Sequence, residues 1–113
     1  MIGLFDDYTI DNYKEILKLK GMLESDGIPF YFREVGREIA GLHGYQLCYP
    51  TRDIFSRVCS VIEHGGSYGH EDDLLEIMGL LTPEEEEHDS VVGGLTAKDV
   101  YGRIKHHWEG EKR

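Results

Sequence analysis

The strongest constraint on the fold is a helix pattern that ends abruptly and passes straight into a strand pattern. Apolar residues recur at helical intervals over residues 12–25, and Asn12 precedes a glutamate at the spacing of a capping box. Gly27 suits the left-handed position after a helix, and Pro29 forbids its continuation. The aromatic run that follows predicts a β-strand over residues 29–35. A helix joined to a strand by so short a turn predicts a fold that mixes the two.

The neighbouring segments extend this pattern into a two-layer sandwich. An apolar run that turns polar predicts a first strand over residues 2–9, and a glycine-rich loop leads to a further strand at residues 45–49. A second helix is predicted over residues 51–64, with Thr51 as its N-cap. Its expected apolar stripe consists of Ile54, Phe55, Val58, Val61 and Ile62. The order β-α-β-β-α predicts an α+β fold of the ferredoxin-like kind.

The C-terminal half predicts helices rather than strands. Asp73 repeats the capping spacing and predicts a short helix over residues 73–81. Thr82, followed by a proline and glutamates, predicts the start of another helix. Valines and glycines at residues 91–94 interrupt this pattern, and a last amphipathic helix is predicted from Thr96. This half is therefore expected to be a mostly helical extension.

We accordingly expect a ferredoxin-like domain over residues 1–66 and a helical extension over residues 67–113, packed on it or next to it within one structural domain. Strand alternation leaves one face of the sheet directed away from the two helices of the sandwich. That face is expected to carry Phe5, Tyr31, Arg33, Gln46 and Cys48. Exposed aromatic surface of this extent marks an interface, so either the extension covers it or two chains meet across it as a homodimer.

The net charge limits the classes of partner. The chain of 113 residues has 22 acidic and 12 basic residues, which gives a formal charge of −10 at neutral pH. A polyanion repels phosphate backbones and anionic lipid, so the charge disfavours direct binding to nucleic acid or to a membrane surface. No apolar run approaches the roughly 20 residues of a membrane span, and Met1 leads into strand-like sequence instead of a signal peptide. We expect a cytoplasmic protein.

The two cysteines, Cys48 and Cys59, form neither a redox motif nor a metal motif. Each lies in an apolar segment, where a reduced thiol packs as a small hydrophobic group. His43 lies five positions before Cys48 and is the base that a catalytic thiol would use, although nothing in the sequence brings the two together. The residue patterns typical of hydrolases do not occur in the sequence. We therefore expect a protein that is not an enzyme.

Two groups of histidines are the candidates for a metal site. They are His64 and His70, followed by acidic residues, and the adjacent pair His106 and His107. Neither group has the spacing of a zinc or calcium motif, and adjacent histidines on a helix point about 100° apart. The sequence therefore predicts no bound metal and no cofactor.

The densest group of charged residues surrounds the glycine-rich loop between the second and third predicted strands. It consists of Arg33, Glu34, Arg37, Glu38 and His43. Glycine amides and two arginines can bind an anion there, whereas a solvated hairpin loop with surface ion pairs explains the same residues without a ligand. Tyr101 and Trp108, on the last helix, are candidate anchors for a partner or parts of the core.

A resemblance follows from the order of these motifs. Leu23 and Glu24 are followed by Gly27, Ile28 and Pro29, then by an aromatic strand, the pair Arg33 and Glu34, the glycine-rich loop and the run from Gly44 to Pro50. Over residues 2–64 this arrangement resembles a small bacterial family of proposed signal-transducing proteins of unknown function, related in fold to the nitrogen-regulatory GlnB-like proteins. The resemblance implies a ferredoxin-like domain with a cytosolic regulatory or adaptor role, and it carries over no catalytic residues.

Three functions are consistent with these observations. The first is a non-catalytic regulatory or adaptor protein that binds a partner protein through the loop of residues 33–44 or through the C-terminal helices. The second is a sensor that binds a small anionic metabolite or a nucleotide at the same loop. The third, which follows from the charge of −10, is an acidic inhibitor of an enzyme that binds nucleic acid.

Overall fold

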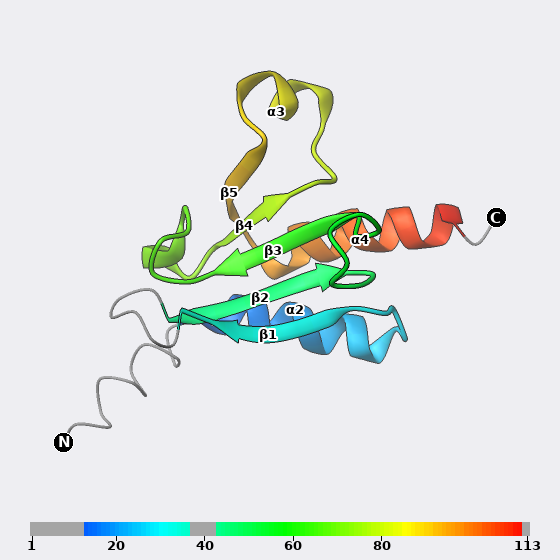
Figure 1. Ribbon diagram of the computed structural model, residues 1–113, viewed down its shortest axis with the longest axis horizontal. Coiled ribbons are helices and arrows are strands. Elements are labelled where there is room, and N and C mark those ends of the chain that lie inside the picture. Colours follow the sequence, from blue (N-terminus) through cyan, green and yellow to red (C-terminus); the bar gives the residue numbers. More distant parts are fainter. Residues whose placement is uncertain (1–12, 37–42, 112–113) are drawn as a thin grey trace.

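The protein has an α+β fold built on one antiparallel sheet. The computed structural model describes residues 13–36 and 43–111 (Figure 1). Each strand pairs with the next along the chain, so the sheet order is β1-β2-β3-β4-β5. The strands are β1 (Tyr31–Val35), β2 (Gly44–Tyr49), β3 (Cys59–Glu63), β4 (Leu75–Met78) and β5 (Val91–Leu95). The helices are α2 (Lys14–Ser25), α3 (Pro83–His88) and α4 (Ala97–Glu111), with a single 3-10 turn, η1 (His70–Asp72).

The hydrophobic core lies between the sheet and the two long helices, which lie on the same side of it (Figure 1). The fully buried side chains of this core are Ile16, Leu19, Leu23, Leu47, Val61, Leu75, Ile77, Ala97, Val100 and Ile104. Within the described residues, no helix is long and apolar enough to span a membrane. The expected boundary at residue 66 does not divide the sheet, because β3, which precedes it, pairs with β4, which follows it.

The other side of the sheet, here called the open face, carries the alternate side chains of the strands. By register these are Tyr31, Arg33, Gln46, Cys48, Ser60, Ile62, Glu76 and Met78. The expectation that the C-terminal helices cover this face is wrong, because α4 packs against α2 and the buried strand residues on the opposite side. Within the described part of the chain, no helix covers the open face.

Residues 51–64 do not form the predicted helix, so the helix that would complete the ferredoxin-like order is absent from this segment. Its second half is strand β3, in which Val61 faces the core and Ile62 faces the opposite side. Ile54 and Phe55 are exposed on the loop before the strand and share no stripe with Val61. Short apolar runs rich in β-branched residues form strands when partner strands are available on both sides.

Two further segments of the C-terminal half are strands where helix or a chain break was expected. Leu75 and Ile77 are buried in β4, and the residue between them is not, which is the period of a strand. The segment of residues 91–94 belongs to β5, the edge strand beside β4. The structure confirms the predicted helix of residues 12–25, the strands at residues 29–35 and 45–49, the helix that starts after Thr82, and the last helix. The strand predicted at residues 2–9 lies outside the described residues.

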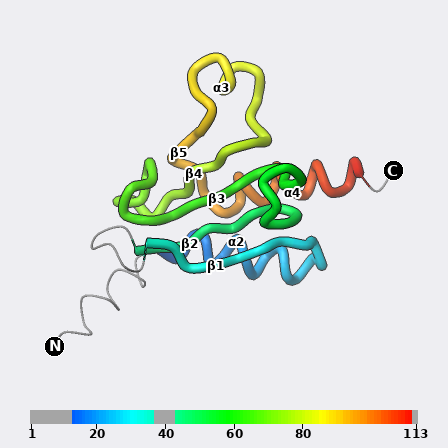
Figure 2. The backbone as a smooth tube through the Cα atoms, viewed as in Figure 1, coloured from blue at the N-terminus to red at the C-terminus, as the bar shows by residue number. Residues whose placement is uncertain are grey.

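The chain between β4 and β5 projects from the sandwich as an arm that carries α3 (Figure 2). Thr82 caps α3 with the predicted capping box, in which Glu85 is the reciprocal partner. Arg103 of α4 donates two hydrogen bonds of 2.8 Å to the Glu85 carboxylate and a third, of 2.9 Å, to the Leu80 carbonyl. The bond from Arg103 and the cap by Thr82 lower the pKa of Glu85 to about 2.

Arg103 holds the arm against α4 through this bidentate contact. We expect Arg103→Lys to keep the charge but lose the paired geometry, which raises amide hydrogen exchange in α3 roughly tenfold. Exchange at Val61, in the centre of the sheet, serves as the control and should not change. Equal acceleration at both places would show that the substitution unfolds the whole protein instead of releasing the arm.

Candidate binding site on the open face

A short loop between β2 and β3 folds over one end of the open face. Asp53 holds its turn, because its carboxylate accepts hydrogen bonds from the Phe55 amide at 3.0 Å and from the Ser56 hydroxyl at 3.2 Å. The loop leaves Cys48 only 1% exposed, although Cys48 lies on the open face. Ile54 and Phe55 point outward instead, with 65% and 92% of their surface exposed. The loop therefore presents two large apolar side chains to solvent.

Beneath this loop is a pocket of about 210 Å³, here called the arginine pocket, whose lining includes three arginines. It is lined by Tyr31, Arg33, Gln46, Cys48, Arg52, Ile54 and Arg57. None of these lining residues is acidic. The pocket is therefore a cationic site on a chain whose net charge is −10.

Neighbouring side chains contact two of the three arginines, Arg33 and Arg52. The Nε of Arg33 donates to Gln46 Oε1 at 2.8 Å, and the Gln46 amide in turn donates to the Ser60 hydroxyl at 2.9 Å. Arg52 lies over the ring of Tyr31, with its guanidinium carbon 5.7 Å from the ring centroid. These contacts hold both arginines in place without neutralising them.

The third arginine reaches the floor of the pocket. Arg57 Nη1 lies 3.7 Å from the sulfur of Cys48. Among the described residues, Arg103 is the only arginine in an ion pair, so the three pocket arginines have no described carboxylate partner. Arginine presents donors in a planar fork that matches a carboxylate or phosphate group. The pocket can therefore bind an oxyanion.

The structure divides the cluster that the sequence places around the loop of residues 33–44. Arg33 lies on the open face, whereas the next residue, Glu34, is on the other side of the strand and pairs with His43 at 2.9 Å. Arg37 and Glu38 lie outside the described residues. Of the described members of the cluster, Arg33 alone lines the arginine pocket. Arg52 and Arg57 were not predicted, because their segment carries the spacing of a helix.

The two aromatic residues of α4 lie on the opposite side of the molecule from the open face. The Tyr101 hydroxyl donates to the carboxylate of Asp26, and the ring lines a groove of about 710 Å³ between α2 and α4. Trp108 packs against the hydrophobic core. These contacts give both aromatic residues a role in joining α4 to the rest of the fold.

The thiols are placed apart from each other and from a base. Cys48 lies opposite Ser60, and Cys59 lies opposite Tyr49, so the two cysteines point to opposite faces of the sheet and do not pair. Burial raises the pKa of the Cys59 thiol to about 12. His43 is five residues from Cys48, which is about 16 Å along an extended chain. The extended strand between them therefore keeps His43 away from Cys48.

The histidines make separate contacts. His64 accepts a hydrogen bond from the Gly66 amide, and burial lowers its pKa. His70 pairs with Glu71, and the hydroxyl of Tyr49 lies 2.8 Å from Nδ1 of His107. Within the described residues, no three histidine, cysteine or acidic side chains are grouped so that they could hold a metal ion.

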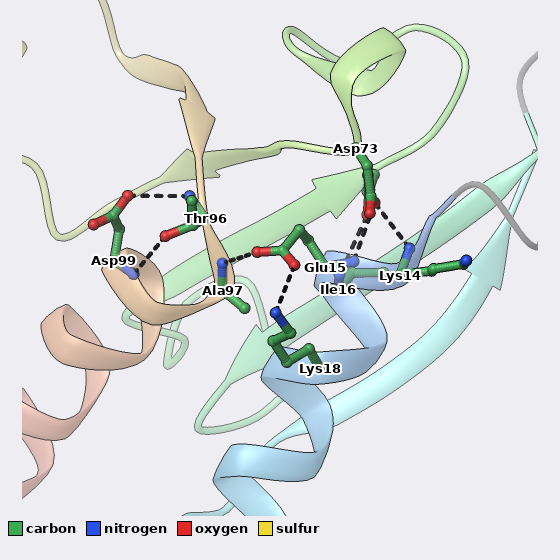
Figure 3. Close-up of polar contacts among 9 residues, drawn as sticks. Lys14, Glu15, Ile16, Lys18, Asp73, Thr96, Ala97 and Asp99 are labelled. Atoms are coloured by element: carbon green, nitrogen blue, oxygen red, sulfur yellow. Dashed lines mark hydrogen bonds and ion pairs between the residues drawn. The ribbon is translucent and has the colours of Figure 1, made fainter.

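A second polar centre, which the sequence did not predict, joins the starts of the two long helices (Figure 3). Asp73 accepts hydrogen bonds from the Lys14 and Glu15 amides at 2.8 and 3.1 Å, and Glu63 accepts one from the Ile16 amide at 3.2 Å. Glu15 in turn accepts one from the Ala97 amide, the first residue of α4, at 2.8 Å. Carboxyl groups from other elements therefore satisfy the free amides at both helix starts.

Glu63 is unusual within this centre because its side chain is fully buried. Burial, and then a hydrogen bond with Asp73 and the charge of Asp73, raise the pKa of Glu63 to about 9. Glu63 Oε2 has no hydrogen-bond partner among the described residues, and the raised pKa favours a protonated carboxyl, which can donate its proton to Asp73. A perturbed carboxyl can mark a catalytic acid, but a substrate has no access to this one. Its role is to cap α2.

Comparisons of the chain with models of protein families, with curated proteins and with solved structures found no match.

Proposed function

We propose that this chain is a non-catalytic regulatory or adaptor protein that binds a partner protein through the open face of its sheet. The observation that carries the proposal is the pair Ile54 and Phe55, which project from a loop that Asp53 holds in place beside the open face. Isolated apolar residues on a surface are ordinary, but here they adjoin a pocket lined by arginine and tyrosine. This combination is typical of a binding surface.

The composition of the surface supports a protein as the partner. Aromatic residues and arginine are enriched in the residues that contribute most to binding between proteins. The loop is preorganised by its turn, so little conformational entropy is lost when Phe55 is buried. The regulatory role is what the resemblance of residues 2–64 to a family of proposed signal-transducing proteins of unknown function implies.

A second candidate function is a sensor of a small anion, now placed at the arginine pocket instead of the loop of residues 33–44. Three arginines without a described carboxylate partner favour it. A pocket of about 210 Å³ is smaller than the roughly 300–1,000 Å³ of sites for drug-sized ligands, which favours a small anion over a nucleotide. The sensor would bind a phosphate or a small carboxylate.

Site-specific photo-crosslinking in the cells that make the protein tests the proposal. A photoreactive phenylalanine analogue replaces Phe55 in one variant and Tyr68, which is 63% exposed on another loop, in the control. We expect the variant at residue 55 to form a discrete product with one protein, and this product to disappear when Ile54→Ser is added. Products that are the same at both positions, or none at residue 55, would contradict the proposal.

A further inference from the structure

We infer that the arginine pocket binds the carboxylate of an acidic side chain in a peptide segment of the partner. This inference rests on the proposed function and names the chemistry that its binding surface recognises. The pocket would receive one carboxylate between Arg33, Arg52 and Arg57, while the apolar neighbour of that acidic residue would contact Ile54 and Phe55.

The distribution of charge favours an acidic ligand. The chain has almost twice as many acidic as basic residues, 22 against 12, yet no acidic residue lines this pocket. The fourth described arginine, Arg103, is bound by the carboxylate of Glu85. Three like charges that line one pocket repel one another, and an anion bound there relieves that repulsion. The pocket is therefore complementary to a negative group that the described chain does not itself provide.

The contacts of Arg33 and Arg52 also favour the binding of an oxyanion. Gln46 holds Arg33 through Nε, and the ring of Tyr31 supports Arg52. These contacts leave the terminal nitrogens of both side chains available to a ligand. Arginines that are already oriented lose little freedom when they bind an oxyanion, which favours a specific contact over a diffuse charge interaction.

The apolar neighbours decide between a peptide and a free ion. Ile54 lines the pocket, but Phe55 does not, so a phosphate or acetate ion in the pocket would leave Phe55 with 92% of its surface in solvent. An acidic residue beside an apolar residue in an extended segment uses both parts of the surface. A volume of about 210 Å³ suits one carboxylate group of a ligand that extends beyond the pocket. The observations thus favour an acidic and apolar peptide.

Nuclear magnetic resonance of the arginine Nε–Hε groups provides the test. The probe is a blocked peptide of five residues, with a central glutamate between two leucines, titrated to 10 mM at constant ionic strength. We expect saturable shifts at Arg33, Arg52 and Arg57, and none at Arg103, which is the internal control because Glu85 already occupies it. The matched peptide with glutamine in place of glutamate should cause no saturable shift.

Two comparisons complete the test. Arg57→Gln should weaken binding of the glutamate peptide at least tenfold, whereas Arg103→Lys should leave it unchanged. Sodium phosphate in place of the peptide separates the two sources of an oxyanion: saturation by phosphate but not by the peptide would overturn the inference and identify a small-anion site. The absence of saturable shifts with both probes would also overturn it. Cross-linking at Phe55 reports on the proposed function independently, so the failure of one proposal is distinguishable from the failure of the other.

Discussion

Glu63→Gln is expected to remove most of the dependence of the protein's stability on pH between about pH 5 and 9. The pKa of the fully buried Glu63 is raised from 4.5 to about 9, first by burial and then by Asp73. Between these values the folded state holds a proton that the unfolded state has lost. The free energy of unfolding therefore falls as pH rises through this window, by at most about 1.4 kcal/mol per pH unit, and levels off above the folded pKa.

Glutamine at this position retains an oxygen that can accept from the Ile16 amide, and its own amide can donate to Asp73. Urea unfolding of the wild-type and variant proteins at unit intervals from pH 5 to 9 measures the effect. Glu24→Gln, at an exposed glutamate of α2, the helix that Glu63 caps, is the control and should reproduce the wild-type slope. If Glu63→Gln also reproduced the wild-type slope, Glu63 would not be the group that holds the proton.

Gly44→Ala is expected to destabilise the protein by about 3 kcal/mol, at the upper end of the cost of overpacking. A Cβ at Gly44 would overlap the backbone carbonyl of Glu63 and the Cα of His64, neither of which can rotate away. The strands β2 and β3 would have to separate at the end that carries Glu63. Thermal unfolding should show a melting temperature lower by roughly 10 °C.

Gly21→Ala is the matched control. Gly21 lies within α2, and a Cβ there meets no other atom within 4 Å. Alanine in an exposed helical position is more favourable than glycine by roughly 0.5–1 kcal/mol, so this variant should melt at a higher temperature than the wild type. Similar losses of stability in both variants would mean that the close approach of β2 and β3 at Gly44 is not a feature of the protein.

Most of the elements predicted correctly have a local signal at one end. α2 ends at a glycine and a proline, β1 begins after that proline, and Thr82 and Thr96 each form a hydrogen-bonded cap. At Asp73 the local capping signal predicted the wrong element. Its spacing to the next glutamate suggested a helix of its own, but its carboxylate caps α2 instead, at Lys14 and Glu15. In the sequence, a residue that caps the helix that follows it cannot be distinguished from one that caps a distant helix.

Segments with short apolar runs were the ones predicted incorrectly. Residues 59–63 and 75–78 form strands because each segment pairs with a strand on both of its edges. A local sequence pattern does not report these partner strands. The candidate site was affected in the same way. Arg33 was recognised because it adjoins a loop, whereas Arg52 and Arg57 join it only because their segment folds back over the sheet. No local pattern reports that contact.

Thiol labelling of Met78→Cys tests the central claim, that the open face is accessible in the free protein, most directly. Met78 lies on this face in register with Ser60 and is 49% exposed, whereas the natural Cys48 and Cys59 are buried and serve as internal controls. With a maleimide at neutral pH, we predict that the new thiol reacts at nearly the rate of a free peptide thiol and the natural cysteines roughly a hundredfold more slowly. Protection of residue 78 to the level of Cys59 would contradict the account, because another part of the chain or a second copy would then cover the face.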